Sequence, residues 1–380
     1  MGAANANAIT SGSDTHAEWL AVLGRREMPT DGVEDYCDSL AEALARRGIK
    51  LKKMRIGWAE RGWLAAWQEL RRQGESWRGR WVVLQYTALA WSRRGFPLGA
   101  LAVAWILRRR GARMAVVFHE HCGVPSRGLV GKIRERFQNF VVRRLYRSAA
   151  KSIFTSPLRR IAWLPPRASR AAFIPIGANI PAPAVNGSRA GLAGRNSRTI
   201  AVFCVGDPPY RSREISDIAY AARSLASNGT ELRVVFLGKG TAEAKDEIQR
   251  AFEGTGVEVS NLGVLSAEAV AGVLAKSDSM VCVRGALYPG RGSALAGVCC
   301  GIPIIGYAGA CEGTPFAEAG VELVPYADRE ALAGAVARVL KDPQLWRDLH
   351  ERSVRAQQKY FSWDVIAASF GEALGGGASP

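Results

Sequence analysis

Short apolar runs alternate with helical segments along most of this 380-residue chain, and this alternation limits the possible fold more than any other feature. In the first half, apolar runs predict strands at 19–25, 49–58, 81–86, 113–120 and 151–156. Helical segments separate them, beginning with 31–48, where Asp31 is the expected N-cap. Strands that alternate with helices predict a parallel sheet covered on both faces.

The segment 179–198 interrupts this pattern, because it is rich in Pro, Gly, Ala, Asn and Ser and has no hydrophobic period. It predicts a linker. Beyond it the alternation restarts, with strands expected from 199–206 onward and three closing helical segments after residue 327. We therefore expect an α/β fold with two doubly wound Rossmann-like domains that face a cleft. The expected division is a disordered tail at 1–15, domains at 16–178 and 199–361, and a final helix at 362–374.

Charge is distributed very unevenly along the chain, which carries a formal net charge of +17. Residues 1–180 contain 31 Lys and Arg against 13 Asp and Glu, whereas residues 181–380 contain 20 against 21. The first half is therefore expected to meet an anionic partner, namely a membrane leaflet, a nucleic acid or an anionic substrate. No nucleic-acid-binding module is recognisable, so we expect no nucleic acid partner.

The segment 129–148 is the strongest membrane candidate, because apolar residues on one helical stripe are flanked by Lys and Arg. Such a helix either lies on anionic lipid or packs on the sheet with a solvated basic rim. Six tryptophans between residues 58 and 91, with nearby arginines, fit a membrane surface, an acceptor pocket or a core equally.

The remaining composition argues for a cytoplasmic protein. The seven cysteines form no CxxC pair and several lie in apolar strands, which predicts reduced core thiols and no metal site. The N-terminus does not resemble a secretory signal, and the longest apolar run, 98–107, is about half of the roughly 20 residues that span a bilayer. We expect a cytoplasmic location, with peripheral attachment to the inner face of the membrane.

Candidate anion-binding residues follow the strands of the second half. Gly290, Arg291, Gly292 and Ser293 stand where a strand meets a helix, so free N–H groups and an arginine could hold a phosphate. A plain strand-to-helix turn capped by Ser293 is the alternative. Arg211 and Arg213 follow the first strand of this half, and Lys239 follows the next. These three cations either bind phosphate or are solvated.

Three candidates in the first half occupy comparable positions. Gly32 begins the helix after the first strand, where a substrate could approach the backbone closely or where the residue is only a small one after an N-cap. His119 and Glu120 end the strand 113–120, and a polar pair at that end of a parallel strand faces the cleft more often than the core. Because His titrates near neutrality, His119 could position a hydroxyl or exchange a proton with it.

These residues resemble a known family, the family-four group of GT-B-fold glycosyltransferases. The resemblance covers nearly the whole chain and is strongest in "FIPIGANIP", in "LAGVCCGIPIIGYAGACEGTPFAEAGVELVPYADREALAGAVARVLKD" and in "FSWDVIAASF". It implies that the second domain binds a nucleotide-diphosphate sugar and the first binds the acceptor. It also implies that the last helix crosses back to the first domain.

The resemblance further assigns roles to the candidates. Gly32 matches the glycine loop near the donor phosphates, His119 matches the histidine beside the transferred sugar, and 290–293 matches the loop under the diphosphate. Arg211 or Arg213 could replace the family's Arg and Lys phosphate pair, although the register is shifted.

The chain departs from the family at the paired glutamates that usually bracket this loop. Their positions fall on Tyr288 and Ala296, and Glu312 is the nearest acid that could compensate. The resemblance implies a transferase that moves a sugar, with retention of anomeric configuration, to a glycan or lipid-linked acceptor in cell-surface polysaccharide or glycolipid assembly. It would need a nucleotide-sugar donor, no other cofactor and no metal. The alternative is a catalytically silent relative that acts as a scaffold in a glycan-assembly complex.

Overall fold

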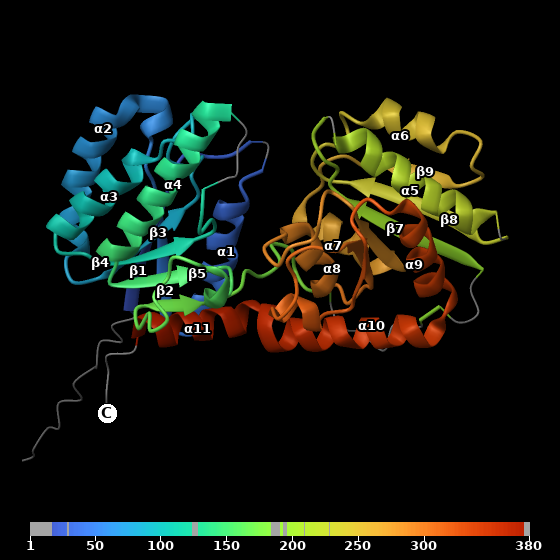
Figure 1. Cartoon of the computed structure of the whole chain (residues 1–380). Helices are drawn as coiled ribbons and strands as arrows, with labels where there is room; N and C mark the ends of the chain where they lie inside the picture. The colour runs from blue at the N-terminus through green and yellow to red at the C-terminus, as the bar shows by residue number, and fades with distance from the viewer. Residues whose placement is uncertain are drawn as a thin grey trace, which may run out of the picture.

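The computed structural model describes residues 17–28, 30–123, 128–183, 191–192, 196–208, 210–227 and 229–375. The tail predicted at 1–15 and half of the predicted linker, residues 184–190 and 193–195, lie outside these residues. Two separate six-stranded sheets, each fully parallel, lie side by side within the described chain (Figure 1). This confirms the predicted α/β class with two Rossmann-like domains.

The first sheet has the strand order β2-β1-β3-β4-β5-β6. Its strands are β1 (Ala17–Leu23), β2 (Ile49–Arg55), β3 (Trp81–Tyr86), β4 (Arg113–Phe118), β5 (Lys151–Phe154) and β6 (Ala171–Phe173). The helices that connect them are α1 (Gly32–Ala45), α2 (Trp58–Gln73), α3 (Leu98–Arg109) and α4 (Gly128–Ser148). β3 has the predicted bounds, because its burial on both faces leaves a continuous apolar run in the sequence.

The second sheet has the order β12-β11-β10-β7-β8-β9. Its strands are β7 (Ser197–Phe203), β8 (Glu231–Leu237), β9 (Glu258–Asn261), β10 (Ser279–Cys282), β11 (Ile304–Tyr307) and β12 (Val321–Val324). Its helices are α5 (Tyr210–Ala226), α6 (Lys245–Phe252), α7 (Ala267–Lys276), α8 (Gly292–Cys299), α9 (Arg329–Lys341) and α10 (Pro343–Ala356). β7 begins inside the segment predicted as linker, because Ser197 and Arg198 pair with β8.

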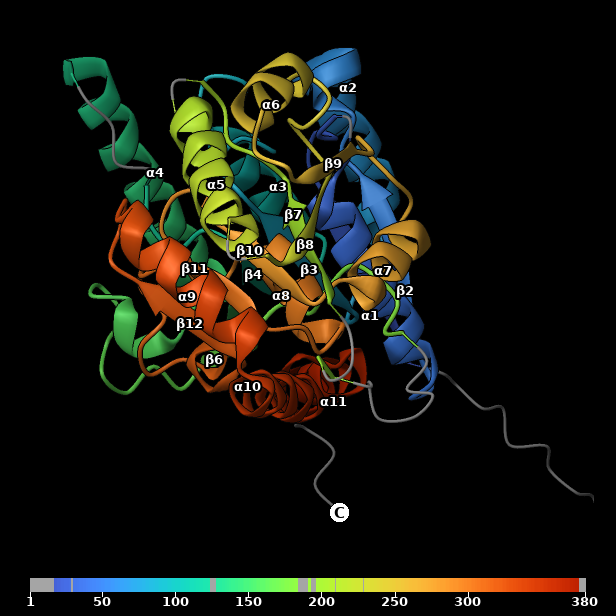
Figure 2. The ribbon, with the colours of Figure 1, turned by 90° about the vertical axis from the view of Figure 1, so that its right-hand side faces the viewer.

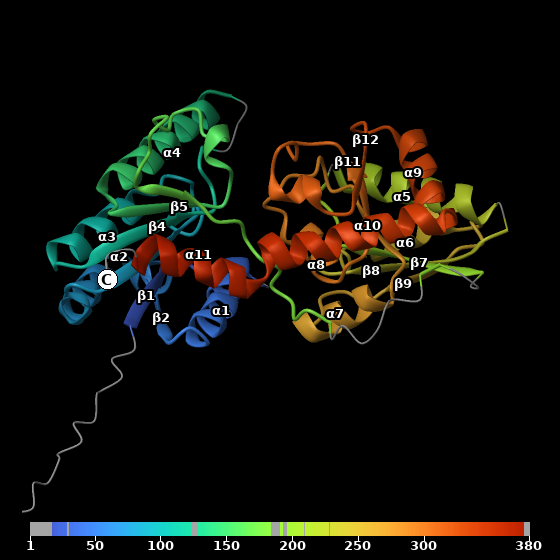
Figure 3. The ribbon, with the colours of Figure 1, turned by 90° about the horizontal axis from the view of Figure 1, so that it is seen from below.

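The last helix, α11 (Trp363–Gly375), leaves the second unit and covers the first. α10 and α11 lie below both sheets in Figure 1, and Figure 3 shows the two helices from below as a nearly continuous rod. The apolar face of α11 carries Ile366, Phe370 and Leu374, which are buried in one cluster with Trp19 of β1 and Tyr36 of α1. The chain thus closes back on its own first domain.

α3 corresponds to the apolar run at 98–107, and half of its residues are buried between α2, α4 and the sheet. Leu98 and Trp105 are more than half exposed. No helix within the described part of the chain has the length and apolarity required to cross a membrane.

Candidate functional site

The strand orders locate a crevice in each sheet. In doubly wound sheets, ligands bind outside the carboxyl ends of the strands, where the strand order reverses. The order reverses between β7 and β10 in the second sheet and between β1 and β3 in the first. The loops that follow these four strands therefore form the candidate ligand sites.

The loop between β10 and α8 is stabilised by its own arginine. Arg291 is the N-cap of α8, and its guanidinium donates to the carbonyl oxygens of Arg284 and, at 3.3 Å, Ala286. It also lies 5.1 Å from the ring centroid of Tyr288. Gly290 packs against the Tyr288 ring, and Gly292 and Ser293 form the first turn of α8. The start of α8, with Arg291 beside it, favours an anion at this point.

A buried carboxylate joins this loop to the loop after β7. Glu214 of α5 is only 2% exposed, and its Oε2 accepts a 2.8 Å hydrogen bond from the backbone N–H of Gly206. It also accepts from the backbone of Gly285. Burial raises the pKa of Glu214, while these N–H groups and the nearby Arg284 and Arg291 oppose the rise. Glu214 thus holds together the two loops at the reversal point of the second sheet.

The other predicted cations of this sheet make contacts of their own. Arg211 Nε donates to Glu247 Oε2 of α6 at 2.8 Å, and Arg213 donates to the hydroxyl of Tyr326 at 2.7 Å. Lys239 Nζ lies 3.3 Å from Glu27 Oε1, which belongs to the loop after β1 of the other sheet. Arg284, in contrast, is exposed at the end of β10. In the sequence, Arg284 and Arg291 are the two cationic residues that most closely precede α8.

On the first sheet, His119 directly follows β4 and is half-buried. Its Nε2 lies 2.9 Å from Gln85 Oε1 at the end of β3, and its ring makes an edge contact with Tyr36 at 5.1 Å. Because the amide oxygen can only accept, Nε2 carries the proton and Nδ1 keeps its lone pair. Burial lowers the pKa of His119 to about 4, with a small opposing effect from Asp31. His119 is therefore neutral at physiological pH and suited to hydrogen bonding with a hydroxyl.

Glu120 and Gly32 lie on the same edge of the sheet. Glu120 Oε2 accepts a 2.7 Å hydrogen bond from the Ala88 N–H, and burial raises the pKa of its carboxyl group. The carbonyl of Gly32 accepts from Asn179 Nδ2 at 3.0 Å, and a Cβ at Gly32 would meet nothing within 4 Å. There is space for a ligand against this glycine. The role of Gly32 beside the donor phosphates stays a prediction.

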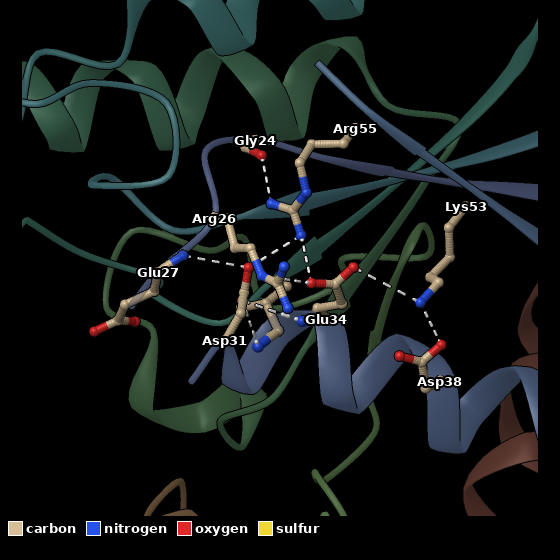
Figure 4. Close-up of polar contacts among 9 residues, drawn as sticks. Gly24, Arg26, Glu27, Asp31, Glu34, Asp38, Lys53 and Arg55 are labelled. Atoms are coloured by element: carbon tan, nitrogen blue, oxygen red, sulfur yellow. Dashed lines mark hydrogen bonds and ion pairs between the residues drawn. The ribbon is translucent and has the colours of Figure 1, made fainter. Parts of the chain in front are cut away.

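Figure 4 shows how ion pairs fix the loop after β1. Asp31 caps α1 through the N–H groups of Val33 and Glu34, and Arg55 contacts Asp31 Oδ2 at 3.1 Å. Arg55 also donates to the carbonyl of Gly24 at 2.8 Å, so both ends of the loop are tied to one side chain. Glu27, which contacts Lys239 of the second sheet, projects from this loop.

A second link between the two units involves the proposed compensating acid. Arg160, in the segment after β5, donates to the main-chain carbonyls of Ala310 and Glu312 in the loop after β11. The Glu312 side chain is exposed. Its role as a substitute for a missing glutamate stays a prediction. Among the residues that the structure describes, no group of three or more His, Cys, Asp or Glu side chains is placed to hold a metal ion.

Three of these residues were not singled out by the sequence analysis. Arg284 could have been found, because it directly follows an apolar strand, as His119 does. Gln85 lies inside the apolar run that predicted β3 and gave no separate signal. In the sequence, Glu214 is one more charged residue in the stretch 211–214. Its role becomes visible only in the structure, where it accepts hydrogen bonds from two loops that are distant in the sequence.

We predict that His119→Gln flattens the dependence of stability on pH. The pKa of His119 is about 4 in the folded protein, whereas the ordinary histidine pKa of 6.5 applies in the unfolded chain. The unfolded state therefore binds more protons between these values, and stability is lost as pH falls from 6.5 toward 4, by up to about 3 kcal/mol. Urea unfolding of both proteins at pH 7, 5.5 and 4.5, followed by tryptophan fluorescence, measures this loss. Equal losses in the variant and the wild type would contradict a neutral, buried His119.

We also predict that Glu214→Ala destabilises the second unit by about 1–3 kcal/mol, because two backbone N–H groups lose their acceptor. Glu214→Gln keeps one acceptor oxygen and should lose less. Hydrogen exchange of the Gly206 and Gly285 amides provides the check: both should exchange faster in the alanine variant. Unchanged exchange would show that Glu214 does not hold the loops.

Comparisons with known proteins place this geometry in context. No family model and no curated protein matches the sequence. Among solved structures, the chain is similar to HepE from Anabaena in complex with UDP and glucose, at 14% identity and a TM-score of 0.64, over 95% of this chain and 100% of that one. It is also similar to sucrose-phosphate synthase from Thermosynechococcus elongatus, at 20% identity and a TM-score of 0.64, over 94% and 98% of the two chains. WaaG, a glycosyltransferase involved in lipopolysaccharide biosynthesis, is 13% identical with a TM-score of 0.61, over 94% and 100%.

The fold is GT-B. The likeness extends over nearly the whole chain, so it covers both sheets and not a single Rossmann-like half. It confirms the fold that the sequence resemblance implied. At sequence identities this low, the structural similarity establishes the fold but not the activity.

Proposed function

We propose that this protein is a glycosyltransferase that moves a sugar from a nucleotide-diphosphate sugar to a glycan or lipid-linked acceptor. The observation that carries the proposal is the pair of loops at the reversal point of the second sheet. There Glu214 joins them and Arg284 and Arg291 precede α8. The structural neighbours support a donor of this class, because HepE was crystallised with UDP and with UDP-glucose.

The donor diphosphate would lie against the start of α8, where Arg284, Arg291 and helix N–H groups stabilise the charge that develops on the leaving phosphate. The acceptor hydroxyl would attack the anomeric carbon while the bond to the phosphate oxygen breaks, and the leaving diphosphate would keep the electron pair and take up the proton of that hydroxyl. Residues 284–293 contain no carboxylate that could act as a nucleophile. Retention, which the family resemblance implies, would then proceed by attack on the same face.

Recognition of the ribose and the sugar must differ from the family's usual pattern. Ala296 is buried in α8 and offers no hydrogen bond, and Tyr288 stacks with Arg291. Across the interface, His119 is neutral and would hydrogen-bond a sugar hydroxyl through Nδ1. No metal is needed for any of these interactions.

The outer face of the first unit supports a place on the cytoplasmic surface of a membrane. α4 projects from the first sheet (Figure 2), and its exposed residues include Leu129, Val130 and Phe140. Arg136, Arg143, Arg144 and Arg147 surround a hollow on the same helix. Binding to anionic vesicles that falls with salt, without salt-sensitive retardation of arbitrary DNA, is the expected result. Retardation of DNA without vesicle binding would contradict it.

The donor site is tested by calorimetric and thermal-shift titration of UDP, GDP, ADP and their sugar conjugates, with and without Mg²⁺. One nucleotide should bind saturably, and binding should not require the metal. His119→Ala should bind this nucleotide normally and transfer its sugar more slowly. If none of the nucleotides binds, Tyr288 and Ala296 mark a lost donor site, and a scaffold in a glycan-assembly complex becomes the better explanation.

A further inference from the structure

A tryptophan-lined groove of about 710 Å³ lies on the first unit, between α2, α3 and the loop after β3. Its size is within the range of roughly 300–1,000 Å³ that is usual for ligand pockets. Its main apolar walls are the rings of Trp58, Trp63, Trp67, Trp91 and Phe96. This groove lies apart from the candidate donor loops, which belong to the second sheet.

Two glycines shape the groove. Gly62 interrupts α2 with φ +80°, a conformation that glycine adopts easily, and the break allows Trp58 and Trp63 to stack at 5.0 Å with an interplanar angle of 2°. Gly99 of α3 lies under Trp63, and a Cβ there would be 1.8 Å from the indole Cη2. Trp63 can approach α3 this closely only because residue 99 has no side chain.

The chemistry of the lining discriminates between possible ligands. None of the lining residues is acidic and none has a side-chain amide, so the groove has none of the carboxylate or amide acceptors that commonly bind sugar hydroxyls. Its polar side chains are those of Ser92, Arg93 and Arg94. Exposed Leu98 extends the apolar surface to solvent. An apolar chain that ends in an anionic group complements this lining.

Hydrogen bonds join the groove to the end of β3 and the loop after it, which also contact His119 and Glu120. The indole N–H groups of Trp91 and Trp58 donate to the carbonyls of Gln85 and Ala90, at 2.9 and 3.0 Å. Gln85 holds His119, and Ala88 in the same loop donates to Glu120. A ligand in the groove would therefore place its head beside the loop that carries these contacts.

We propose that the groove binds the hydrocarbon chain of a single lipid phosphate, with the phosphate against Arg93 and Arg94. This rests on the proposed function, because that lipid would be the acceptor or its carrier. It narrows the acceptor class from any glycan to a lipid-linked anion.

The test uses dodecyl phosphate below its micelle-forming concentration, titrated by calorimetry and tryptophan fluorescence. Arg94→Gln removes a rim cation and should weaken binding about three- to tenfold. Ala102→Phe fills the groove and should weaken it about tenfold or more. Arg93 is left unchanged, because it also donates to the carbonyl of Ala59 at the start of α2. Arg71→Gln, an exposed change on α2 outside the groove lining, is the matched control and should bind as the wild type does.

Inorganic phosphate and dodecyl maltoside separate the contributions of the head and the chain. The proposal expects weak or no binding of either. It is overturned if dodecyl maltoside binds as tightly as dodecyl phosphate, or if Arg94→Gln and Ala102→Phe both bind like the wild type. UDP is titrated separately with each variant, and its affinity should not change. Failure of UDP to bind any of them would contradict the proposed function and leave the lipid result intact.

Discussion

Arg291→Ala is expected to weaken binding of the donor nucleotide by about 30- to 100-fold, the loss typical of one charge-assisted phosphate contact. Arg291 has two possible contributions, since its guanidinium carries charge and also holds the carbonyls of Arg284 and Ala286. Calorimetric titration of the nucleotide that binds the wild type measures the loss. His119→Ala should bind that nucleotide normally.

Arg291→Lys separates the two contributions, because lysine keeps the charge but cannot reach both carbonyls with a planar fork. Binding close to that of the wild type would assign the effect to charge, and binding as weak as in Arg291→Ala would assign it to the loop. Arg223→Ala, an exposed change on α5, is the control. Equal loss of nucleotide binding in Arg291→Ala and His119→Ala would contradict the division of roles.

Phe370→Ala is expected to destabilise the first unit by about 3–5 kcal/mol, the usual cost of removing a buried aromatic side chain. Phe370 is fully buried between α11 and the first sheet, in the cluster that includes Trp19 and Tyr36. The ion pair of Arg46 with Asp364 at the start of α11 is exposed and cannot replace this packing. Urea unfolding, followed by tryptophan fluorescence, measures the loss.

Glu372→Ala is the matched control, because Glu372 is exposed on the same helix and its loss should change stability by less than about 0.5 kcal/mol. Limited proteolysis should cut the Phe370→Ala variant near α11 before it cuts the second unit. A Phe370→Ala protein as stable as Glu372→Ala would show that α11 does not hold the first unit together.

Most of the fold could be predicted because its signals are local. The strand 81–86 and the helix capped by Asp31 both appear as expected, since a buried strand and an N-cap each leave a short sequence pattern. β6 and β12 were not predicted. β6 has three residues, and β12 is half-exposed along most of its length, so neither produces a continuous apolar run.

Only part of the candidate site can be predicted from such local sequence patterns. Position at a strand end is visible in the sequence and is sufficient to identify His119, whereas the contact of His119 with Gln85 is not visible there. The pairings of Glu214 with Gly206 and Gly285, and of Lys239 with Glu27, depend on loops that meet only after both sheets form. The tryptophan groove was ambiguous for the same reason, because composition does not show that Gly99 lies under Trp63.

Transfer of radiolabelled sugar is the most direct test of the central claim. The wild-type protein is incubated with the nucleotide sugar that it binds and with a lipid extract from cell membranes, and label is measured in the lipid and glycan fractions. The account predicts label in the lipid fraction, slower appearance with His119→Ala and strong loss with Arg291→Ala. A protein that binds the nucleotide sugar but never transfers its label, with any acceptor fraction, would contradict it.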